Sequence, residues 1–200
     1  MKNPTTRILL VAGAIALAAG IYINLYQPHT AVTVQTVATN GGAIGQEPYG
    51  LDGTHGKKVT EQSFSDKYKL VYFGFTNCPH VCPTSMGNIT AALAALGDKA
   101  NKIQPIFITV DPENDTIQVI KDYLYNFDKR FIGATGTAEE IKAAQQSFRV
   151  YANKTQGNAE HGDVMHSDYV YFLAPDGALL NVLPGETGGQ NMADSLLPAL

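Results

Sequence analysis

The chain has 200 residues, 44% of them hydrophobic, which is enough apolar material for one domain with a proper core plus further segments. Its formal net charge is -4, and no basic run or stripe is present, so no nucleic-acid partner is expected. The only two cysteines, Cys78 and Cys82, are four positions apart. A disulfide between them would close too short a loop to serve as a mere structural staple.

The N-terminus carries a long apolar stretch. Residues 8–23 contain no charge, Lys2 and Arg7 precede them, and the next basic residue is Lys57. This asymmetry predicts a cytoplasmic N-terminus and an exported remainder. We expect residues 1–26 to form an uncleaved signal-anchor, a transmembrane helix, because the run approaches the ~20 residues that span a bilayer. The alternative is a secretory signal peptide that is cut near the alanines of the same stretch.

The next segment reads as a tether. Residues 27–46 are rich in Ala, Thr, Val and Gly and carry no Asp, Glu, Lys or Arg, so we interpret them as a linker. Residues 45–59 contain the turn signals Asp52-Gly53 and His55-Gly56 and are expected to form an irregular hairpin. The folded domain is assigned to residues 47–200.

A buried strand followed by a helix carries both cysteines. Residues 70–75 are apolar almost throughout, which is typical of a strand that is covered on both faces. Pro83 is expected to open a helix whose apolar residues recur at helical spacing as far as Leu96. Cys78 and Cys82 therefore lie where the N–H groups and the positive end of a helix dipole favour thiolates.

Strands and helices alternate over the rest of the chain. A capping box of Thr137 and Glu140 predicts one helix start, and residues 152–165 read as a polar loop. The remaining expected elements are listed in chain order: a strand at 103–110, a helix at 116–127, a short strand at 131–134, a hairpin of 169–173 with 179–183, and a C-terminal helix from about residue 190. This order predicts an α/β sandwich with its active residues at the carboxyl ends of the strands.

Three motifs in this order resemble the Sco/SenC family. The stretch Phe73 to Pro83, FGFTNCPHVCP, is similar to the family's GFTxCPxxCP signature, and Val110 to Thr116, VDPENDT, resembles its VDPxxDT. His166-Ser167, ahead of a Tyr-rich strand and a Pro-Asp-Gly turn, resembles its HS motif. The match covers roughly residues 47–200.

The resemblance implies a fold, a cargo and a place in the cell. The fold is a thioredoxin-like three-layer sandwich, and the cargo is copper, Cu(I) or Cu(II), held by Cys78, Cys82 and His166. Two thiolates and an imidazole form a soft site that suits copper. The family implies delivery to cytochrome c oxidase subunit II or another copper protein, for maturation of the CuA site. The expected location is the inner membrane, as a single-pass protein with its soluble domain on the periplasmic side.

Some positions depart from the family pattern. His80 stands where an acidic residue is usual, and Met165 where Asp commonly precedes the histidine; an exposed loop histidine and a packing methionine are the simpler interpretations. Asn114 stands where Arg is frequent. Asp111 and Asp115 are expected to cap the following helix and to stabilise the site loop.

Three classes of function remain open. The first is a copper metallochaperone, and the second is a membrane-tethered thiol–disulfide oxidoreductase that reduces the oxidase copper-site cysteines and uses redox-active Cys78 and Cys82 but not His166. The third, a peroxiredoxin-like peroxidase, ranks last because Phe75 stands where that class has Thr. The sequence does not separate copper donation from thiol reduction.

Overall fold

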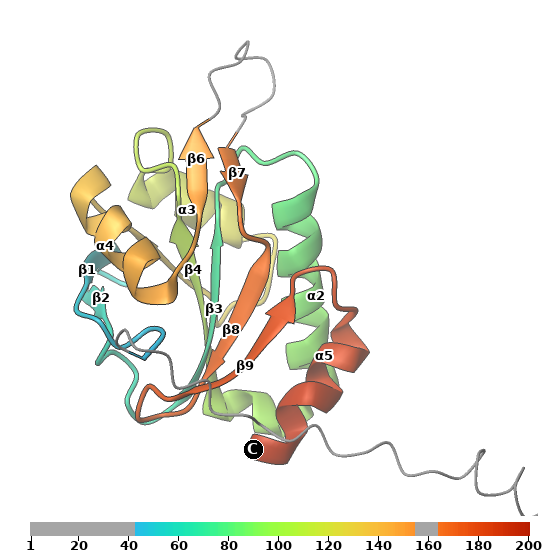
Figure 1. Ribbon diagram of the computed structural model, residues 1–200. Coiled ribbons are helices and arrows are strands. Elements are labelled where there is room, and N and C mark those ends of the chain that lie inside the picture. The colour runs from blue at the N-terminus through green and yellow to red at the C-terminus, as the bar shows by residue number, and fades with distance from the viewer. Residues whose placement is uncertain (1–42, 155–163) are drawn as a thin grey trace, which may run out of the picture. The chain divides into compact units, whose positions relative to one another are not determined.

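A computed structural model of the chain describes residues 43–154 and 164–200, with the backbone alone for residues 153, 154 and 164–166 (Figure 1). Predicted segments 1–26 and most of 27–46 lie outside the described residues. Ile44 and Gly45, at the end of the predicted linker, already contact the domain, because Ile44 packs on the core and the Gly45 N–H donates to the Ser147 carbonyl at 2.9 Å. Within the described ranges, no helix combines the length and apolar character needed to cross a bilayer.

A mixed sheet of seven strands forms the centre of the described domain, in the order β2-β1-β5-β4-β3-β8-β9. Its strands are β1 (Gly50–Gly53), β2 (Lys58–Thr60), β3 (Tyr68–Gly74), β4 (Ile103–Thr109), β5 (Ile132–Thr135), β8 (Tyr169–Leu173) and β9 (Leu179–Pro184). Strands β3, β4 and β5 are parallel neighbours, whereas β8 pairs antiparallel with β3 and β9. The carboxyl end of β3 therefore lies in the middle of the sheet.

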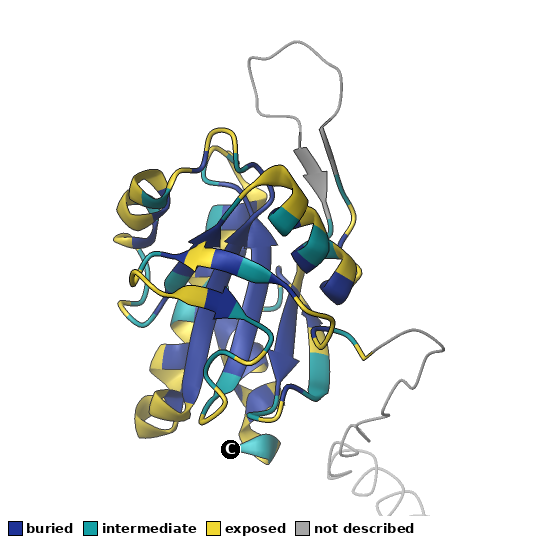
Figure 2. Cartoon of the chain, turned by 90° about the vertical axis from the view of Figure 1, so that its left-hand side faces the viewer, coloured by how far each residue is buried: buried dark blue, intermediate teal, exposed yellow. Residues whose placement is uncertain are grey.

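Helices cover both faces of this sheet. They are α2 (Val81–Ala95), α3 (Ile117–Leu124), α4 (Ala138–Phe148) and α5 (Gly189–Leu196), with short 3-10 helices at Gly97–Lys102 and Leu197–Ala199. Helices α2 and α5 lie side by side (Figure 1). Figure 2 shows the central strands buried between helices whose outer faces are exposed. The predicted α/β sandwich is confirmed.

Neighbouring side chains of β3 point to opposite layers, which fixes where each helix packs. Tyr72 faces Phe107 and the side on which α2 lies, and the Phe107 ring in turn contacts Tyr123 of α3. Phe73 points the other way and packs against Phe148 of α4, with ring centroids 5.2 Å apart. Because aromatic side chains cover both faces of β3, its run of apolar residues does not alternate with polar ones.

Local sequence signals set several element boundaries as predicted. The Thr137 side chain accepts from the Glu140 N–H, and the Glu140 carboxylate accepts from the Thr137 N–H, so the capping box opens α4. Helix α2, however, begins two residues before Pro83, with His80 at its N-cap and Cys82 already in its first turn. Proline is compatible with this position because first-turn N–H groups lack intrahelical partners.

The prediction of a polar loop at 152–165 is wrong at both ends of this segment, where the structure has short strands. Strand β6 (Ala152–Lys154) pairs antiparallel with β7 (Val164–His166) in a separate two-stranded sheet. In Figure 1 these two strands lie beyond the same end of the central sheet at which β3 leads into α2. A register of only three pairs gives too short a pattern for period-two alternation to be read from sequence.

Candidate functional site

The two cysteines occupy the predicted place, in the connection from β3 to α2. Cys78 lies in the loop after the strand, and Cys82 lies within the first turn of the helix. The two sulfurs are not joined by a disulfide in this structure. The Cys82 N–H donates to Cys78 Sγ over 3.4 Å, so four-residue spacing brings the start of the helix onto the first sulfur.

Cys78 is a stabilised thiolate. The pKa of its thiol falls to about 5, first because the Cys82 side chain donates to the sulfur, and then because backbone N–H groups of His80, Val81 and Cys82 point at it. Partial burial opposes this shift without cancelling it. The N–H groups at the helix start, which have no acceptor within the helix, thus favour negative charge on Cys78, as the sequence predicts.

Cys82 has the opposite character. Its side chain is buried, and the bond to Cys78 together with burial raises the pKa of the Cys82 thiol, which therefore keeps its proton. Its sulfur packs so closely on Gly74 that a Cβ there would lie 3.0 Å from Sγ and 3.1 Å from the Phe107 ring. The pair thus consists of one half-exposed thiolate and one buried thiol.

Asp115 fixes the loop that carries Cys78. Its buried carboxylate accepts from the Thr76 N–H at 3.0 Å and from the Thr76 and Thr109 hydroxyls, which joins the loop to the end of β4. Burial raises the Asp115 pKa, although the threonine hydrogen bonds act against that shift. The predicted stabilising role is therefore seen. The predicted role of Asp115 as a helix cap is wrong, because Thr116 is the N-cap of α3.

The backbone of His166 ends β7, directly opposite Ala152 in β6. The imidazole lies outside the described side chains, so the structure does not test its predicted role as a ligand. Among the side chains that are described, no cluster of three or more His, Cys, Asp or Glu could hold a metal ion. The segment after His166 is anchored, because the Ser167 N–H donates to the Tyr151 carbonyl at 3.0 Å and Ser167 Oγ accepts from the Tyr151 N–H.

Three polar residues next to the cysteines were missed by the sequence analysis. Asp168 Oδ1 accepts hydrogen bonds from the Tyr72 hydroxyl at 3.0 Å and from Ser85 Oγ at 2.8 Å. The Tyr72 hydroxyl also interacts with the Cys82 side chain. We call Tyr72, Ser85 and Asp168 the Asp168 cluster. No local pattern marks it, because its members come from β3, α2 and the turn between β7 and β8.

The positions that depart from the family pattern have different outcomes. His80 is exposed at the N-cap of α2, and its carbonyl, rather than its ring, accepts from the Thr84 hydroxyl at 2.8 Å. The Met165 side chain is outside the described part. The Asn114 amide donates to Asp111 Oδ2 at 2.7 Å, so Asn114 holds the turn before α3.

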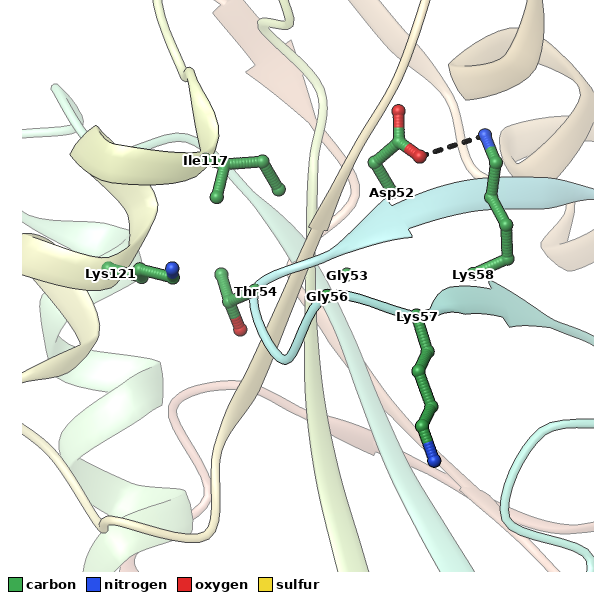
Figure 3. A pocket seen from close by; sticks show the side chains of 8 residues that line it. All are labelled: Asp52, Gly53, Thr54, Gly56, Lys57, Lys58, Ile117 and Lys121. Atoms are coloured by element: carbon green, nitrogen blue, oxygen red, sulfur yellow. Dashed lines mark ion pairs between the residues drawn. The ribbon is translucent and has the colours of Figure 1, made fainter.

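A pocket elsewhere in the described domain does not include the cysteines. It lies between the β1–β2 turn and α3, and Lys57, Lys58 and Lys121 contribute to its lining (Figure 3). Lys58 forms an ion pair with Asp52 at 3.0 Å, and Figure 3 shows Lys57 directed away from Lys121. Because the ammonium groups do not converge, no ligand is assigned to this pocket.

The chemistry of the described site is that of an activated dithiol. A thiolate at Cys78 is both a nucleophile and a soft metal donor, and Cys82 supplies a second sulfur beside it once it releases its proton. The fit for Cu(I) is good because both donors are sulfur and their separation is already set by the helix start.

The chain is similar to proteins of one known family. The SCO1/SenC family model matches residues 37–199. The chain is 36% identical over 146 residues to the mitochondrial protein SCO1 homolog 1 of Arabidopsis thaliana, covering 72% of this chain and 44% of that protein. It spans about half the length of the first curated relatives that it matches.

Two solved structures show the same fold. Copper-bound ScoI of Bradyrhizobium japonicum superimposes with a TM-score of 0.72 at 37% identity, over 79% of this chain and all of that one. BsSco, described as a member of the Sco family of cytochrome c oxidase assembly proteins with a disulfide switch, gives a TM-score of 0.64 at 25% identity, over 81% of this chain and 96% of its own. The fold is thus the thioredoxin-like fold of these proteins.

Proposed function

Because the chain belongs to the SCO1/SenC family, we propose that it is a copper metallochaperone that matures the CuA site of cytochrome c oxidase. Its cargo is copper, and its recipient is subunit II of the oxidase or another copper protein. The observation that carries the proposal is the contact of Cys78 with Cys82 at the start of α2, in a chain 37% identical to a relative solved with copper bound.

The proposed copper ligands are Cys78, Cys82 and His166. The two sulfurs are brought together by the β3–α2 connection, and His166 ends a strand that lies beyond the same end of the sheet (Figure 1). Soft sulfur donors hold Cu(I), and an added imidazole allows the same site to hold Cu(II). Copper binding releases the Cys82 proton, because a metal-bound thiol is deprotonated.

A second function is favoured by the asymmetry of the two thiols. In thiol–disulfide exchange, Cys78 thiolate attacks a partner disulfide, forms a mixed disulfide and expels one partner thiolate. Cys82 then loses its proton, attacks Cys78 and expels the second thiolate, so that two electrons pass to the partner. The alternative is therefore a membrane-tethered reductase of the oxidase copper-site cysteines.

The variant His166→Ala separates the two functions, because imidazole donates to a metal but takes no electrons in thiol exchange. We expect His166→Ala cells at limiting copper to assemble the oxidase copper site as poorly as Cys78→Ser cells. The measurement is oxidase activity and copper content of isolated membranes, with His29→Ala as the matched histidine control. If the copper site assembles normally in His166→Ala cells but fails in Cys78→Ser and Cys82→Ser cells, the protein belongs to the reductase class.

The proposed location follows from the sequence of residues 1–26, which we infer to anchor the chain in the inner membrane. The functional domain would then lie on the periplasmic side, where its copper-protein partner exposes its own site. This placement rests on the charge asymmetry around residues 8–23.

A further inference from the structure

The Asp168 cluster links the segment of the proposed third ligand to both elements that carry the cysteines. Tyr72 belongs to β3, which leads to Cys78, and Ser85 lies three residues after Cys82 in α2. Both hydroxyls donate to one atom, Asp168 Oδ1, and Asp168 follows His166 by two residues. One carboxylate oxygen therefore ties three separate segments together.

The residues around the Asp168 cluster are closely packed. The Asp168 carbonyl accepts from the Gly185 N–H at 3.0 Å, and the Gly185 carbonyl accepts from the Asn88 amide of α2 at 2.9 Å. A Cβ at Gly185 would lie 2.2 Å from Asp168 Oδ1 and 2.3 Å from Ser85 Oγ. Only glycine leaves room for the β9–α5 turn to pass over the carboxylate.

Ser85 and Tyr72 are buried, so neither hydroxyl has bulk water as a ready substitute for Asp168. Loss of the carboxylate would remove a charged acceptor from both buried hydroxyls, which gives the β7–β8 turn a preference for the observed position. The adjacent Ser167 is fixed to Tyr151 by two hydrogen bonds, so the turn is held from both sides.

From these contacts we propose that Asp168 is a positioning residue, which sets the place of His166 relative to Cys78 and Cys82 through Tyr72 and Ser85. The proposal rests on the ligand set given under the proposed function. It predicts that Asp168 acts on copper affinity mainly through the histidine, with a smaller contribution through the contact of Tyr72 with Cys82. Residues that orient metal ligands alter affinity in this way.

The test is a double-mutant cycle on the reduced full-length chain, with apparent copper dissociation constants measured by chelator competition. We expect Asp168→Ala to raise the dissociation constant by about 10- to 100-fold, and Asp168→Asn, which keeps an oxygen acceptor, to stay close to wild type. In a His166→Ala background, Asp168→Ala should cause a much smaller further loss. Asp176→Ala is the matched control, since Asp176 accepts the Ala178 N–H in the β8–β9 turn, at the end of the sheet where β3 begins and away from the cysteines.

A metal-free readout accompanies the cycle. Amide hydrogen exchange at Ser167 should accelerate in Asp168→Ala and not in Asp176→Ala, because the turn loses its tie to Tyr72 and Ser85. Ser85→Ala removes one of the two donors to Asp168, so it should raise the copper dissociation constant and the exchange rate at Ser167 by smaller amounts. This variant replaces Asp168→Ala in the test if Asp168→Ala does not fold.

The outcomes separate this inference from the ligand assignment. If His166→Ala leaves copper affinity unchanged, the ligand set fails and the positioning role fails with it. If His166→Ala weakens binding while Asp168→Ala matches Asp176→Ala, the positioning role alone is overturned. Equal losses from Asp168→Ala in both backgrounds would likewise overturn it, because they would show that Asp168 does not act through His166.

Discussion

Cys78 and Cys82 differ more from one another than their spacing suggests. Cys78 receives the N–H groups of the helix start, whereas Cys82 is buried with its sulfur close to Gly74. One sulfur is therefore poised as the nucleophile and first donor, whereas the other holds a proton that must leave before it binds metal. This division of roles would suit both proposed functions, copper loading and disulfide exchange.

The pH dependence of alkylation tests this difference in the reduced, metal-free chain. The Cys78 pKa of about 5 lies below that of an ordinary thiol. The thiolate is therefore formed as pH rises through about 5 and is lost as pH falls below it. We expect the iodoacetamide rate at Cys78, followed by mass spectrometry, to level off by pH 7, with Cys82 unmodified.

The variant Cys82→Ala is the control for the cause of that shift. It removes the side-chain donor that contributes most to the low Cys78 pKa, so the midpoint should move upward. A rate at Cys78 that keeps climbing between pH 7 and pH 9 in the unsubstituted chain would contradict the thiolate assignment.

Sequence reasoning reached the cysteines because a strand, a helix start and a four-residue spacing are all local patterns. It missed the Asp168 cluster because Tyr72, Ser85 and Asp168 are brought together only by tertiary folding. A tyrosine inside an apolar strand gives no sign that its hydroxyl meets a carboxylate 96 positions later. His166 was identified by a family motif, and geometry has not tested it.

At the scale of elements, Asp115 connects the site loop, β4 and the start of α3. Its carboxylate satisfies the Thr76 N–H and two hydroxyls, all in a region with little access to water. Its position between strand and helix was predicted. The N-cap residue of α3 was predicted wrongly as Asp115 instead of Thr116, because the two residues are adjacent and both residue types favour an N-cap.

Replacing this carboxylate should destabilise the reduced, metal-free domain. We expect Asp115→Ala to lower the free energy of unfolding by about 3 kcal/mol, since each buried donor left unpaired costs about 1–3 kcal/mol and hydroxyls can partly reorient. Urea unfolding followed by circular dichroism gives the value. Asp122→Ala, on the exposed face of α3, should change it by less than about 0.5 kcal/mol.

Equal stabilities of Asp115→Ala and Asp122→Ala would show that the loop is held by other contacts. Asp115→Asn should fall between the two, because its amide oxygen still accepts one of the threonine hydroxyls.

At the scale of the whole molecule, the order of elements was predictable, whereas the strand order was not. Apolar runs and caps located β3, β4, α3, α4 and the β8–β9 hairpin within a few residues. That β8 lies beside β3, and β1 beside β5, depends on pairing between distant segments. Pairing of β3 with β8 brings the end of β7 to the cysteine side of the sheet, as the proposed ligand set of Cys78, Cys82 and His166 requires.

The membrane anchor is also a whole-molecule prediction. Lys2 and Arg7 before the apolar run are expected to leave the N-terminus in the cytoplasm and to export the rest. A reporter that works only in the cytoplasm, fused after Leu200, should be silent, and the same reporter fused after residues 47–200 alone should be active. Activity of the full-length fusion would refute export.

Copper binding by the dithiol is the claim on which the account depends most, and a copper titration of the full-length chain tests it directly. With the cysteines reduced, one copper per chain should bind tightly, and oxidation to the Cys78–Cys82 disulfide should abolish that binding, because the thiolates are the principal donors. Cys78→Ser and Cys82→Ser should each abolish it as well. Tight binding of one copper that survives oxidation, or survives both serine substitutions, would contradict the account.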